Sequence, residues 1–454
     1  MATTIGRMAR HGHDSVGTVA AARADGCSSA TPNPDPVGTV YPEQFGADPT
    51  GKEDSTAAFT AAMDALVNVS AGAARPMASG IINLGGVTLD LAGGQYLIGQ
   101  PLVIPPFTGN VRIRGGTLRA SSTFPTARYI IEVGDAACTP KDNQHVCNEF
   151  VAVEDVFLDG AHVAAGGVQV SLTMGTTIGP SAFITGFKVA GVRVVQGHET
   201  MVLDSWIAEY YWSDTKPGTP CNPANGSGSI GIDIIGEDNY VQNVIIFDYT
   251  CLGVLVNGAA SLLTGVHSWN GGGVAILING SYDIQDRVVG CYLDYSVLQI
   301  VNPSMIVVED SFFYNAHAVL TGAHVNELIM RENTYSLDDY GGNSSVVLTD
   351  PTATCTRVDV SDAIDGEQRK GRPDLILTTR KRKSLHLANA KEWNFDFSDA
   401  LLFTTIDSVT YSLTLDEGQP LVMHAARPPQ GKTVTIETST PVSGTVEVEA
   451  LQCV

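Results

Sequence analysis

The sequence predicts an all-β protein built as a parallel β-helix, on two observations. Charged residues make up only 16% of the 454 residues, whereas glycine occurs 47 times. Few charges, many glycines and short apolar runs are typical of β-structure with many turns. The second observation is a repeat in the middle of the chain, where Gly236, Gly258 and Gly280 recur at a spacing of 22 residues.

Each repeat unit contains short strands rich in valine and isoleucine, separated by glycine, asparagine and aspartate. Val244, Val266 and Val288 keep the same interval as the glycines. A leucine-rich repeat has a similar length, but the L-x-x-L-x-L frame is missing from this sequence. The pattern instead predicts one coil of a β-helix per repeat, with successive coils roughly 4.8 Å apart. Equivalent positions in successive repeats are therefore expected to form columns on the surface.

Composition divides the chain into four segments. Residues 1–36 are expected to be disordered, and residues 37–350 to form the β-helix. Residues 351–384 are predicted as a polar and basic linker, and residues 385–454 as a small antiparallel β-domain. The repeat breaks between Tyr210 and Ser229, where an insertion is expected to project as a loop. Such a loop is either the wall of a binding groove or a tolerated surface insertion.

Charge and hydropathy exclude two classes of partner. The formal net charge of −22 argues against a nucleic-acid-binding role, because such proteins present positive surfaces to phosphates. No window of 18 or more apolar residues occurs, so no membrane span is expected.

The cysteines indicate a secreted protein. Cys138 and Cys147, two of eight cysteines, flank a polar loop at a spacing that predicts a disulfide. The first residues contain no apolar core of a signal peptide, so secretion is expected with a truncated or unusual N-terminus. The alternative is an intracellular protein with eight free thiols.

The stretch YPEQFGADPTGKEDSTAAFTAAMDAL, which begins at Tyr41, predicts how the β-helix starts. Its glycines and Pro49 favour a turn, and Asp54 and Ser55 are suited to cap a helix that begins near Thr56. This stretch resembles the N-terminal signature of right-handed β-helix proteins of the pectate-lyase superfamily. The resemblance implies a helix that covers the open end of the coil, where strand edges would otherwise be unpaired.

Other segments are similar to the plant QUARTET-type polygalacturonases. They are GGTLRAS from Gly115, QGHET from Gln196, LTGVHSWN from Leu263, CYLDYS from Cys291 and WNFDFSDALLF from Trp393. The resemblance implies a polysaccharide-active glycoside hydrolase that acts on pectin or a related cell-wall or matrix glycan. It implies secretion to the cell wall, no cofactor, and a monomer or a homotrimer.

The sequence departs from the family pattern at the usual catalytic motifs. Ordinary polygalacturonases carry N-T-D, D-D, G-H-G and R-I-K on successive coils. Ile230, Cys251 and Leu252 stand where the aspartates are expected, and Gly272 stands where the histidine is expected. Catalysis by other side chains, or its loss, therefore remains open. The alternatives are a non-catalytic glycan-binding or structural wall protein, and a polysaccharide lyase or fructan transferase on the same scaffold.

A glycosidase needs two carboxyl groups, and the aligned repeats offer three candidates. Glu209, Asp248 and Asp294 are expected to precede the same strand of their coils. Glu209 and Asp248 would then lie on neighbouring coils, about 5 Å apart, and Asp248 and Asp294 roughly 10 Å apart. About 5 Å favours retention and about 6.5–9.5 Å favours inversion, so the stereochemistry stays open. Asp248 and Asp294 are the preferred acid and base, with Glu209 in reserve. The competing interpretation is that such turn residues bind backbone amides.

Aromatic side chains accompany these carboxylates. Trp206, His267 and Tyr292 are expected in one column, with Phe247 and Trp269 two positions further along. Aromatic faces stack on the C–H surface of sugars, and a histidine among them is suited to proton transfer or to bonding a sugar hydroxyl. A packed or solvated histidine is the alternative. The predicted substrate-binding residues are Trp206, Phe247, Trp269, Tyr292 and Tyr295.

A turn column of polar residues is a weaker candidate. His198 and Glu199 are expected beside Glu237 and Asp238, which is a possible site for a cation such as Ca²⁺. A solvated acidic ridge is the preferred interpretation, and no metal is predicted.

Electrostatics limits the substrate. Between Val195 and Asp350 the only basic residues besides histidine are Lys216, Arg287 and Arg331, against 18 acidic residues. An acidic groove repels a polyuronate unless Ca²⁺ bridges the charges or the sugars are esterified or neutral. The same charge balance argues against a β-eliminating lyase, which needs a lysine or arginine base.

Overall fold

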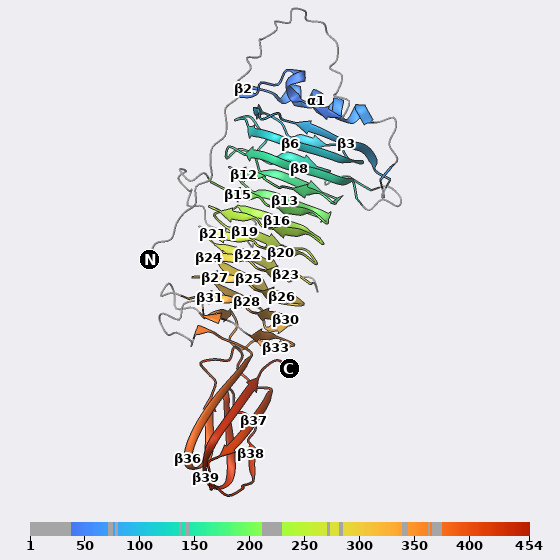
Figure 1. Cartoon of the computed structure of the whole chain (residues 1–454). Helices are drawn as coiled ribbons and strands as arrows, with labels where there is room; N and C mark the ends of the chain where they lie inside the picture. Colours follow the sequence, from blue (N-terminus) through green and yellow to red (C-terminus); the bar gives the residue numbers. More distant parts are fainter. Residues whose placement is uncertain are drawn as a thin grey trace, which may run out of the picture. The chain divides into compact units, whose positions relative to one another are not determined.

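The chain forms a right-handed parallel β-helix followed by an antiparallel sheet, as the sequence predicts (Figure 1). The computed structural model describes residues 38–70, 76–77, 80–135, 138–140, 146–210, 229–269, 273–280, 285–337, 344–361, 364–365 and 375–454. The predicted disordered segment 1–36, the inserted loop after Tyr210 and Gly272 lie outside the described residues. No helix in the described part is long and apolar enough to cross a membrane.

The predicted capping helix is present. The entry to the coil consists of β1 (Thr39–Val40), the 3-10 helix η1 (Pro42–Phe45), β2 (Thr50–Asp54) and α1 (Thr56–Ser70). Asp54 Oδ1 accepts a hydrogen bond from the Thr56 N–H at 2.8 Å, and the Ser55 carbonyl accepts the Phe59 N–H at 3.0 Å. Asp54 and Ser55 therefore start the helix, as expected. One side of α1 is buried in the core of the coil through Ala58, Phe59, Ala62, Met63 and Leu66.

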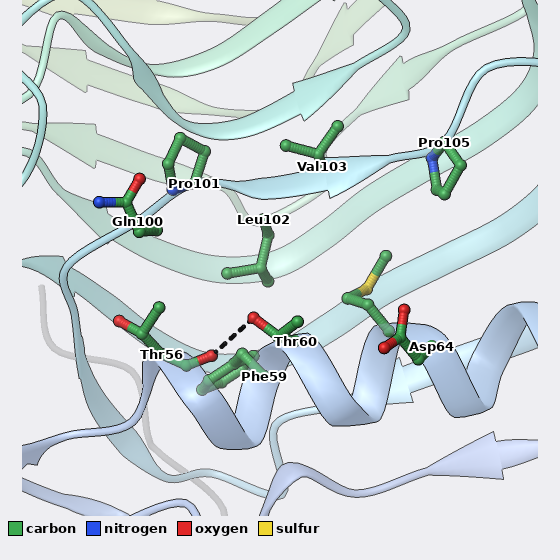
Figure 2. A pocket seen from close by; sticks show the side chains of 10 residues that line it. Thr56, Phe59, Thr60, Asp64, Gln100, Pro101, Leu102, Val103 and Pro105 are labelled. Atoms are coloured by element: carbon green, nitrogen blue, oxygen red, sulfur yellow. Dashed lines mark hydrogen bonds between the residues drawn. The ribbon is translucent and has the colours of Figure 1, made fainter.

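A shallow hollow separates α1 from the first coil. Figure 2 shows its wall, where Thr56, Phe59 and Thr60 on the helix face the segment from Gln100 to Pro105. The hollow holds about 250 Å³, and the Thr60 hydroxyl donates to the Thr56 carbonyl at 3.0 Å within the helix.

Three ladders of short parallel strands form the sides of the coil. The first ladder contains β5 (Leu102–Ile104), β7 (Tyr129–Val133), β9 (Gly166–Ser171), β13 (Ala190–His198), β16 (Ile230–Glu237), β19 (Leu252–Val256), β22 (Val274–Asn279), β25 (Val297–Val301), β28 (His317–Thr321) and β32 (Val346–Leu348). The second contains β1, β3 (Ile82–Asp90), β6 (Thr108–Ala120), β8 (Asn148–Asp159), β11 (Thr177–Ile178), β14 (Met201–Leu203), β17 (Tyr240–Gln242), β20 (Leu262–Thr264), β23 (Arg287–Val289), β26 (Ile306–Glu309), β30 (Leu328–Arg331) and β34 (Asp359–Ser361).

The third ladder carries the candidate site. It contains β2, β4 (Gln95–Ile98), the later parts of β6 and β8, β12 (Phe183–Thr185), β15 (Trp206–Ala208), β18 (Ile245–Phe247), β21 (His267–Trp269), β24 (Tyr292–Asp294), β27 (Phe312–Tyr314), β31 (Thr334–Ser336) and β35 (Ile364–Asp365). Two short strands, β29 (His324–Asn326) and β33 (Thr354–Thr356), pair beside the coil, and β10 (Thr173–Met174) pairs with β8 and β13.

The 22-residue interval holds for part of the repeat. Ile230 pairs with Leu252, and Leu252 pairs with Val274, so each interval is 22 residues. The expected alignment of Val288 with Val266 is wrong, because Val288 pairs with Leu263 instead. That interval is 25 residues, since this coil has three extra residues before β23.

The recurring glycines have a steric cause. Gly197, Gly236 and Gly258 stack in the same turn of successive coils. A Cβ atom on Gly236 would clash with the carbonyl oxygen of Gly197, and one on Gly258 with the carbonyl oxygen of Gly236. Glycine is required here because the backbones of neighbouring turns lie in direct contact.

The predicted C-terminal β-domain is an antiparallel sheet. It is formed by β36 (Arg380–Asp396), β37 (Ser408–Leu415), β38 (His424–Ala426) and β39 (Thr433–Leu451), around a separate core that includes Trp393 and Phe397. The segment predicted as a linker, 351–384, contains β33, β34 and β35 of the coil and the start of β36. Its basic residues from Arg380 to Lys383 therefore belong to a strand, which a run of four charged residues does not indicate in the sequence.

Disulfides are present, and one was predicted. Cys138 is bonded to Cys147, as expected. A second disulfide joins Cys355 of β33 to Cys453, which follows β39, so it links the C-terminal sheet to the coil. Among the described residues, Cys291 is a free thiol and is buried. The alternative of eight free thiols is therefore wrong.

Candidate functional site

The outer surface of β12, β15, β18, β21, β24 and β27, here called the aromatic face, carries the candidate site. Trp206 pairs with Ile245, Ile245 with His267, and His267 with Tyr292. Trp206, His267 and Tyr292 therefore share one column, as the aligned repeats predict. Phe247 pairs with Trp269 in the second predicted column.

Alternation along each short strand places these side chains outside. The middle residues Ile207, Ile246, Ser268 and Leu293 are fully buried in the coil, so their neighbours on both sides point outward. Trp206 is 47% exposed and Tyr295 is 55% exposed. Phe247 is only 8% exposed, because the rings beside it on the aromatic face cover it.

The rings of the aromatic face contact one another across coils. Phe247 is stacked on Trp269 with centroids 5.2 Å apart, and it meets the edge of Trp206 at 5.7 Å. His267 is stacked on Tyr292 at 4.5 Å, with 5° between the ring planes. The result is two runs of contacting rings on this face, one through Trp206, Phe247 and Trp269 and the other through His267 and Tyr292, which together are called the aromatic strip.

Sequence reasoning missed three members of this strip. Phe183 extends it at one end and is stacked on Trp206 at 6.3 Å. Phe312 extends it at the other end, 5.0 Å from Tyr292, and Tyr314 meets Tyr295 edge-on at 5.3 Å. The aligned repeats contain the signal, because Phe183 and Phe312 lie in the column of Trp206 and Tyr292, and Tyr314 lies two positions further along its strand.

Asp294 and His267 form the polar part of the aromatic face. Burial raises the pKa of the Asp294 carboxyl above its ordinary value, and the nearby His267 opposes part of this rise. Burial likewise lowers the pKa of His267, and Asp294 opposes part of that change. Asp294 Oδ1 and His267 Nε2 are both buried atoms without a hydrogen-bond partner among the described residues. Their environment favours a neutral acid beside a neutral imidazole.

The structure does not bring the three candidate carboxylates together in one position. Asp294 is the last residue of β24, whereas Glu209 and Asp248 follow the last residues of β15 and β18. The expectation that all three carboxylates occupy equivalent positions is therefore wrong. Asp294 lies one residue earlier in its repeat than Asp248 does, and the turn after β24 is shorter than the turn after β18. One residue along a strand reverses the direction of a side chain.

Glu209 and Asp248 are held inside these turns. Glu209 is 5% exposed, and its carboxylate accepts hydrogen bonds from the Ser229 hydroxyl and from the Thr250 N–H, the latter at 2.7 Å. Asp248 is 1% exposed and has a left-handed backbone with φ of 49°. Glu209 matches the competing interpretation that turn carboxylates bind backbone amides, and Asp248 is buried as well. Of the three, Asp294 is the carboxyl that borders the aromatic strip.

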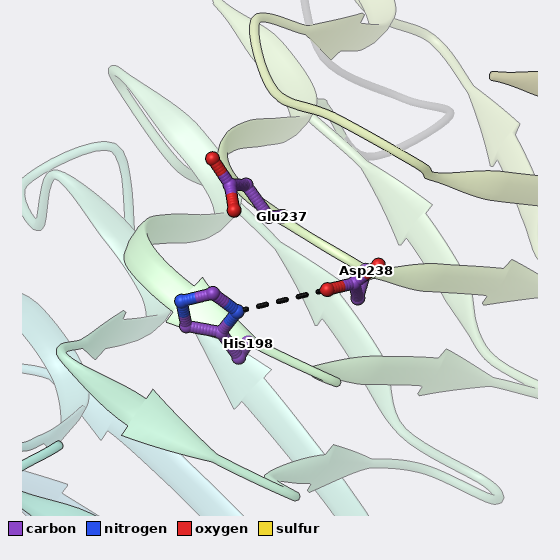
Figure 3. Close-up of side chains that lie close together, drawn as sticks. All are labelled: His198, Glu237 and Asp238. Atoms are coloured by element: carbon purple, nitrogen blue, oxygen red, sulfur yellow. Dashed lines mark ion pairs between the residues drawn. The ribbon is translucent and has the colours of Figure 1, made fainter. Parts of the chain in front are cut away.

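The turn column of polar residues lies on another side of the coil. Figure 3 shows His198 Nδ1 facing Asp238 Oδ2, at 3.8 Å, with Glu237 beside them. Potential ligand atoms of His198, Glu237 and Asp238 all lie within 4.8 Å of one another. All three side chains are at least partly exposed, which fits the predicted solvated ridge. A hollow of about 460 Å³ adjoins His198 and Glu237.

Comparison with known proteins shows that the sequence is similar to one curated protein. It is 32% identical over 419 residues to polygalacturonase QRT3 of Arabidopsis thaliana, an alignment that covers 90% of this chain and 83% of that protein. No family model matches the chain.

Solved structures show similarity in fold. ORF18 of Geobacillus virus E2 superposes with a TM-score of 0.51 at 12% identity, covering 89% of this chain and 77% of that one. The A-module of mannuronan C-5 epimerase AlgE4 from Azotobacter vinelandii has a TM-score of 0.48 at 14% identity, covering 70% of this chain and 86% of that one.

Proposed function

This chain belongs to the polygalacturonase family that includes QRT3 of Arabidopsis thaliana, and from that premise we propose that it is a glycoside hydrolase acting on pectin or a related cell-wall polysaccharide. The observation that carries the proposal is the aromatic face with Asp294 and His267 in it. A sugar chain lies along the strip, and its C–H faces pack on Trp206 and Tyr292.

Asp294 is the proposed proton donor. Its raised pKa keeps the carboxyl protonated to a higher pH than usual, so it is able to protonate the oxygen of the bond being cleaved. Burial lowers the pKa of His267, and its Nε2, which has no hydrogen-bond partner among the described residues, is placed to bond a sugar hydroxyl. The two residues thus act on the same sugar, one as acid and the other as a positioning group.

The test is the release of reducing ends by the Asp294→Asn variant. We expect its rate on a panel of pectins and neutral wall glycans to fall by about 100-fold or more, because general acid catalysis contributes roughly 10²–10⁴-fold. Asp238→Asn is the matched control, since Asp238 lies in a turn away from the aromatic face and its φ of 57° suits asparagine. Full activity of Asp294→Asn, in a variant that melts like the unmodified protein, would exclude Asp294 as the acid.

The second candidate function is non-catalytic glycan binding by the same face. It is favoured by the burial of Glu209 and Asp248, which leaves Asp294 without either of the predicted partner carboxyls. It is also favoured by Ile230, Cys251 and Leu252 at the expected catalytic positions. Glycan binding that depends on Trp206, without release of reducing ends from any substrate, would support this function over hydrolysis.

The proposed function also indicates where in relation to the cell the protein acts. The disulfides Cys138–Cys147 and Cys355–Cys453 are typical of proteins that fold in an oxidising environment. A wall polysaccharide is reached from outside the cell, so we propose that the chain acts there.

A further inference from the structure

We propose that the Asp286 side chain is a pH-sensitive switch in the coil: it joins two neighbouring turns when its carboxyl group is protonated and loosens them when that group ionises. Asp286 directly precedes β23 on the second ladder, so it lies on a different side of the coil from the aromatic face. The inference goes beyond the proposed function and does not depend on it.

Two asparagines show how the turns of neighbouring coils are joined. Asn333 directly precedes β31, and its Oδ1 accepts the N–H of Ser311, the residue before the paired strand β27, at 3.0 Å. Its Nδ2 donates to the carbonyl of Val308, three residues before Ser311, at 2.9 Å. Asn239, directly before β17, forms the same two contacts with the Thr200 N–H, at 3.0 Å, and with the carbonyl three residues before Thr200, at 3.5 Å. Each asparagine thus accepts one backbone hydrogen bond and donates another.

Asp286 stands in the same position with a carboxyl group in place of the amide. Its Oδ1 accepts the N–H of Ser261, the residue before the paired strand β20, at 2.9 Å. The spacing in both asparagine bridges assigns the Gly258 carbonyl, three residues before Ser261, to the second oxygen of Asp286. A carboxylic acid accepts one hydrogen bond and donates another as the amide does, whereas a carboxylate has no proton to donate. Only the protonated form of Asp286 therefore reproduces the bridge.

The described surroundings of Asp286 supply no buried cation for its ionised form. The side chain is 4% exposed, and the turns before the neighbouring strands β20 and β26, residues 257–261 and 302–306, contain no charged residue. On the strands themselves the charged side chains are Arg287 of β23 and Glu309 of β26, and both point outward by the alternation of buried and exposed positions. Burial raises the pKa of Asp286 to about 7, and the backbone N–H that it accepts opposes part of that rise.

The consequence is a loss of stability as pH rises. In the unfolded chain an aspartate ionises near pH 4, whereas folded Asp286 keeps its proton to about pH 7. The contribution of the protonated bridge is therefore complete below about pH 4, decreases as pH rises towards about 7, and is lost above that value. An ionised Asp286 places a negative oxygen against the Gly258 carbonyl, so we expect the turns before β20 and β23 to loosen.

The experiment compares Asp286→Asn with the unmodified full chain by thermal unfolding at pH 4.5 and pH 8. Asparagine keeps the shape of the side chain, and its amide supplies the second hydrogen bond at every pH. We expect the variant to melt at least about 2 °C higher at pH 8 and within about 1 °C at pH 4.5. Hydrogen exchange at pH 8 locates the change, because the peptide that contains Ser261 should exchange several-fold more slowly in the variant. Asp310→Asn, which alters an exposed aspartate, is the control and should show no such difference between the two pH values.

The reciprocal change tests the comparison with the asparagines. Asn239→Asp places a carboxyl group in a bridge of the same form, so we expect it to fold normally at pH 4.5 and to melt several degrees lower than the unmodified protein at pH 8. An Asp286→Asn variant that is no more stable than the unmodified protein at pH 8, or is stabilised equally at both pH values, would overturn the inference. The inference would also fail if the melting temperature of Asn239→Asp differed from that of the unmodified protein by the same amount at pH 4.5 and pH 8.

Discussion

Asp233 and Asp294 lie on two different sides of the same coil, and their carboxyl groups have different neighbours. On the first ladder, Asp233 of β16 is 5% exposed and forms an ion pair with Arg193 of β13, which is its direct neighbour in the register, at 3.2 Å. On the aromatic face, Asp294 lies near His267, whose pKa is lowered by burial, and near aromatic rings. The first arrangement stabilises the coil, and the second leaves a carboxyl group available for chemistry.

The difference follows from how a β-helix repeats. Equivalent residues on successive coils stand opposite one another, so an arginine one coil away is the natural partner for a carboxylate. Arg119 and Asp159 form the same kind of direct pair, at 3.1 Å, on the third ladder before the aromatic face begins. Aromatic residues follow on this ladder from Phe157, which pairs with Phe183 and is stacked on it at 5.0 Å. On this ladder Asp294 therefore has His267 and aromatic rings as its neighbours, where the earlier coils place an arginine opposite an aspartate.

Breaking the arginine pair is expected to have the largest effect on stability. Arg193→Met leaves Asp233 buried without its cation, and we expect the free energy of unfolding at pH 7 to fall by about 2 kcal/mol. This is less than the roughly 3–5 kcal/mol of a fully buried pair, because the Arg193 side chain is 36% exposed. Denaturant unfolding followed by fluorescence measures the change. The control is Arg331→Met, which breaks the exposed pair with Asp359 and should cost less than about 1 kcal/mol.

The pH dependence of the stability of Arg193→Met tests whether the loss of the ion pair with Asp233 is the cause of the destabilisation. Burial already raises the pKa of Asp233, and Arg193 opposes that rise, so the variant raises the pKa further. A carboxyl with a raised folded pKa loses stability as pH increases from the unfolded value, about 4, through the folded value. The loss in the free energy of unfolding caused by Arg193→Met should therefore be smaller near pH 4 than at pH 7. A deficit of equal size at both values would contradict the electrostatic explanation.

Removing an aromatic ring is expected to affect binding and not folding. Trp206→Ala should weaken glycan binding about 10-fold, equivalent to about 1.4 kcal/mol, since it deletes one stacking surface. Titration calorimetry with an esterified pectin oligosaccharide measures this change. Tyr240→Ala is the matched control, because Tyr240 is 40% exposed at the start of β17, on a different side of the coil. Equal losses in the two variants would mean that the aromatic face is not the binding surface.

The smallest expected effect is a shift in the pH profile. His267 lowers the pKa of Asp294, so His267→Gln should let that pKa rise. Activity that requires protonated Asp294 falls as pH increases through its pKa, and this decline should move to higher pH in the variant. Rates measured from pH 4 to pH 8 would show the shift. If the decline in activity stays at the same pH, or moves to lower pH, His267 does not lower the pKa of the group that must be protonated.

Much of the fold was predictable from local patterns. Asp54 and Ser55 identify the start of α1, and the 22-residue spacing of Gly236 and Gly258 identifies a coil, because stacked turns exclude a Cβ atom. The columns containing Trp206 and His267 followed from the same repeat. The start of the strand at Arg380 was not predictable in this way, since it consists of four consecutive basic residues, mostly exposed, without an alternating apolar pattern.

The 22-residue repeat, without a leucine-rich frame, was enough to predict a parallel β-helix with columns of aromatic residues, because equivalent positions of successive coils stack on one another. Only the tertiary structure decided which carboxyl group borders that strip. Glu209 accepts hydrogen bonds from Ser229 and Thr250, and Asp248 is buried, whereas Asp294 ends its strand one position earlier and points outward. The reason is physical: turn length sets the direction of each side chain, and a shift of one residue in a strand reverses it.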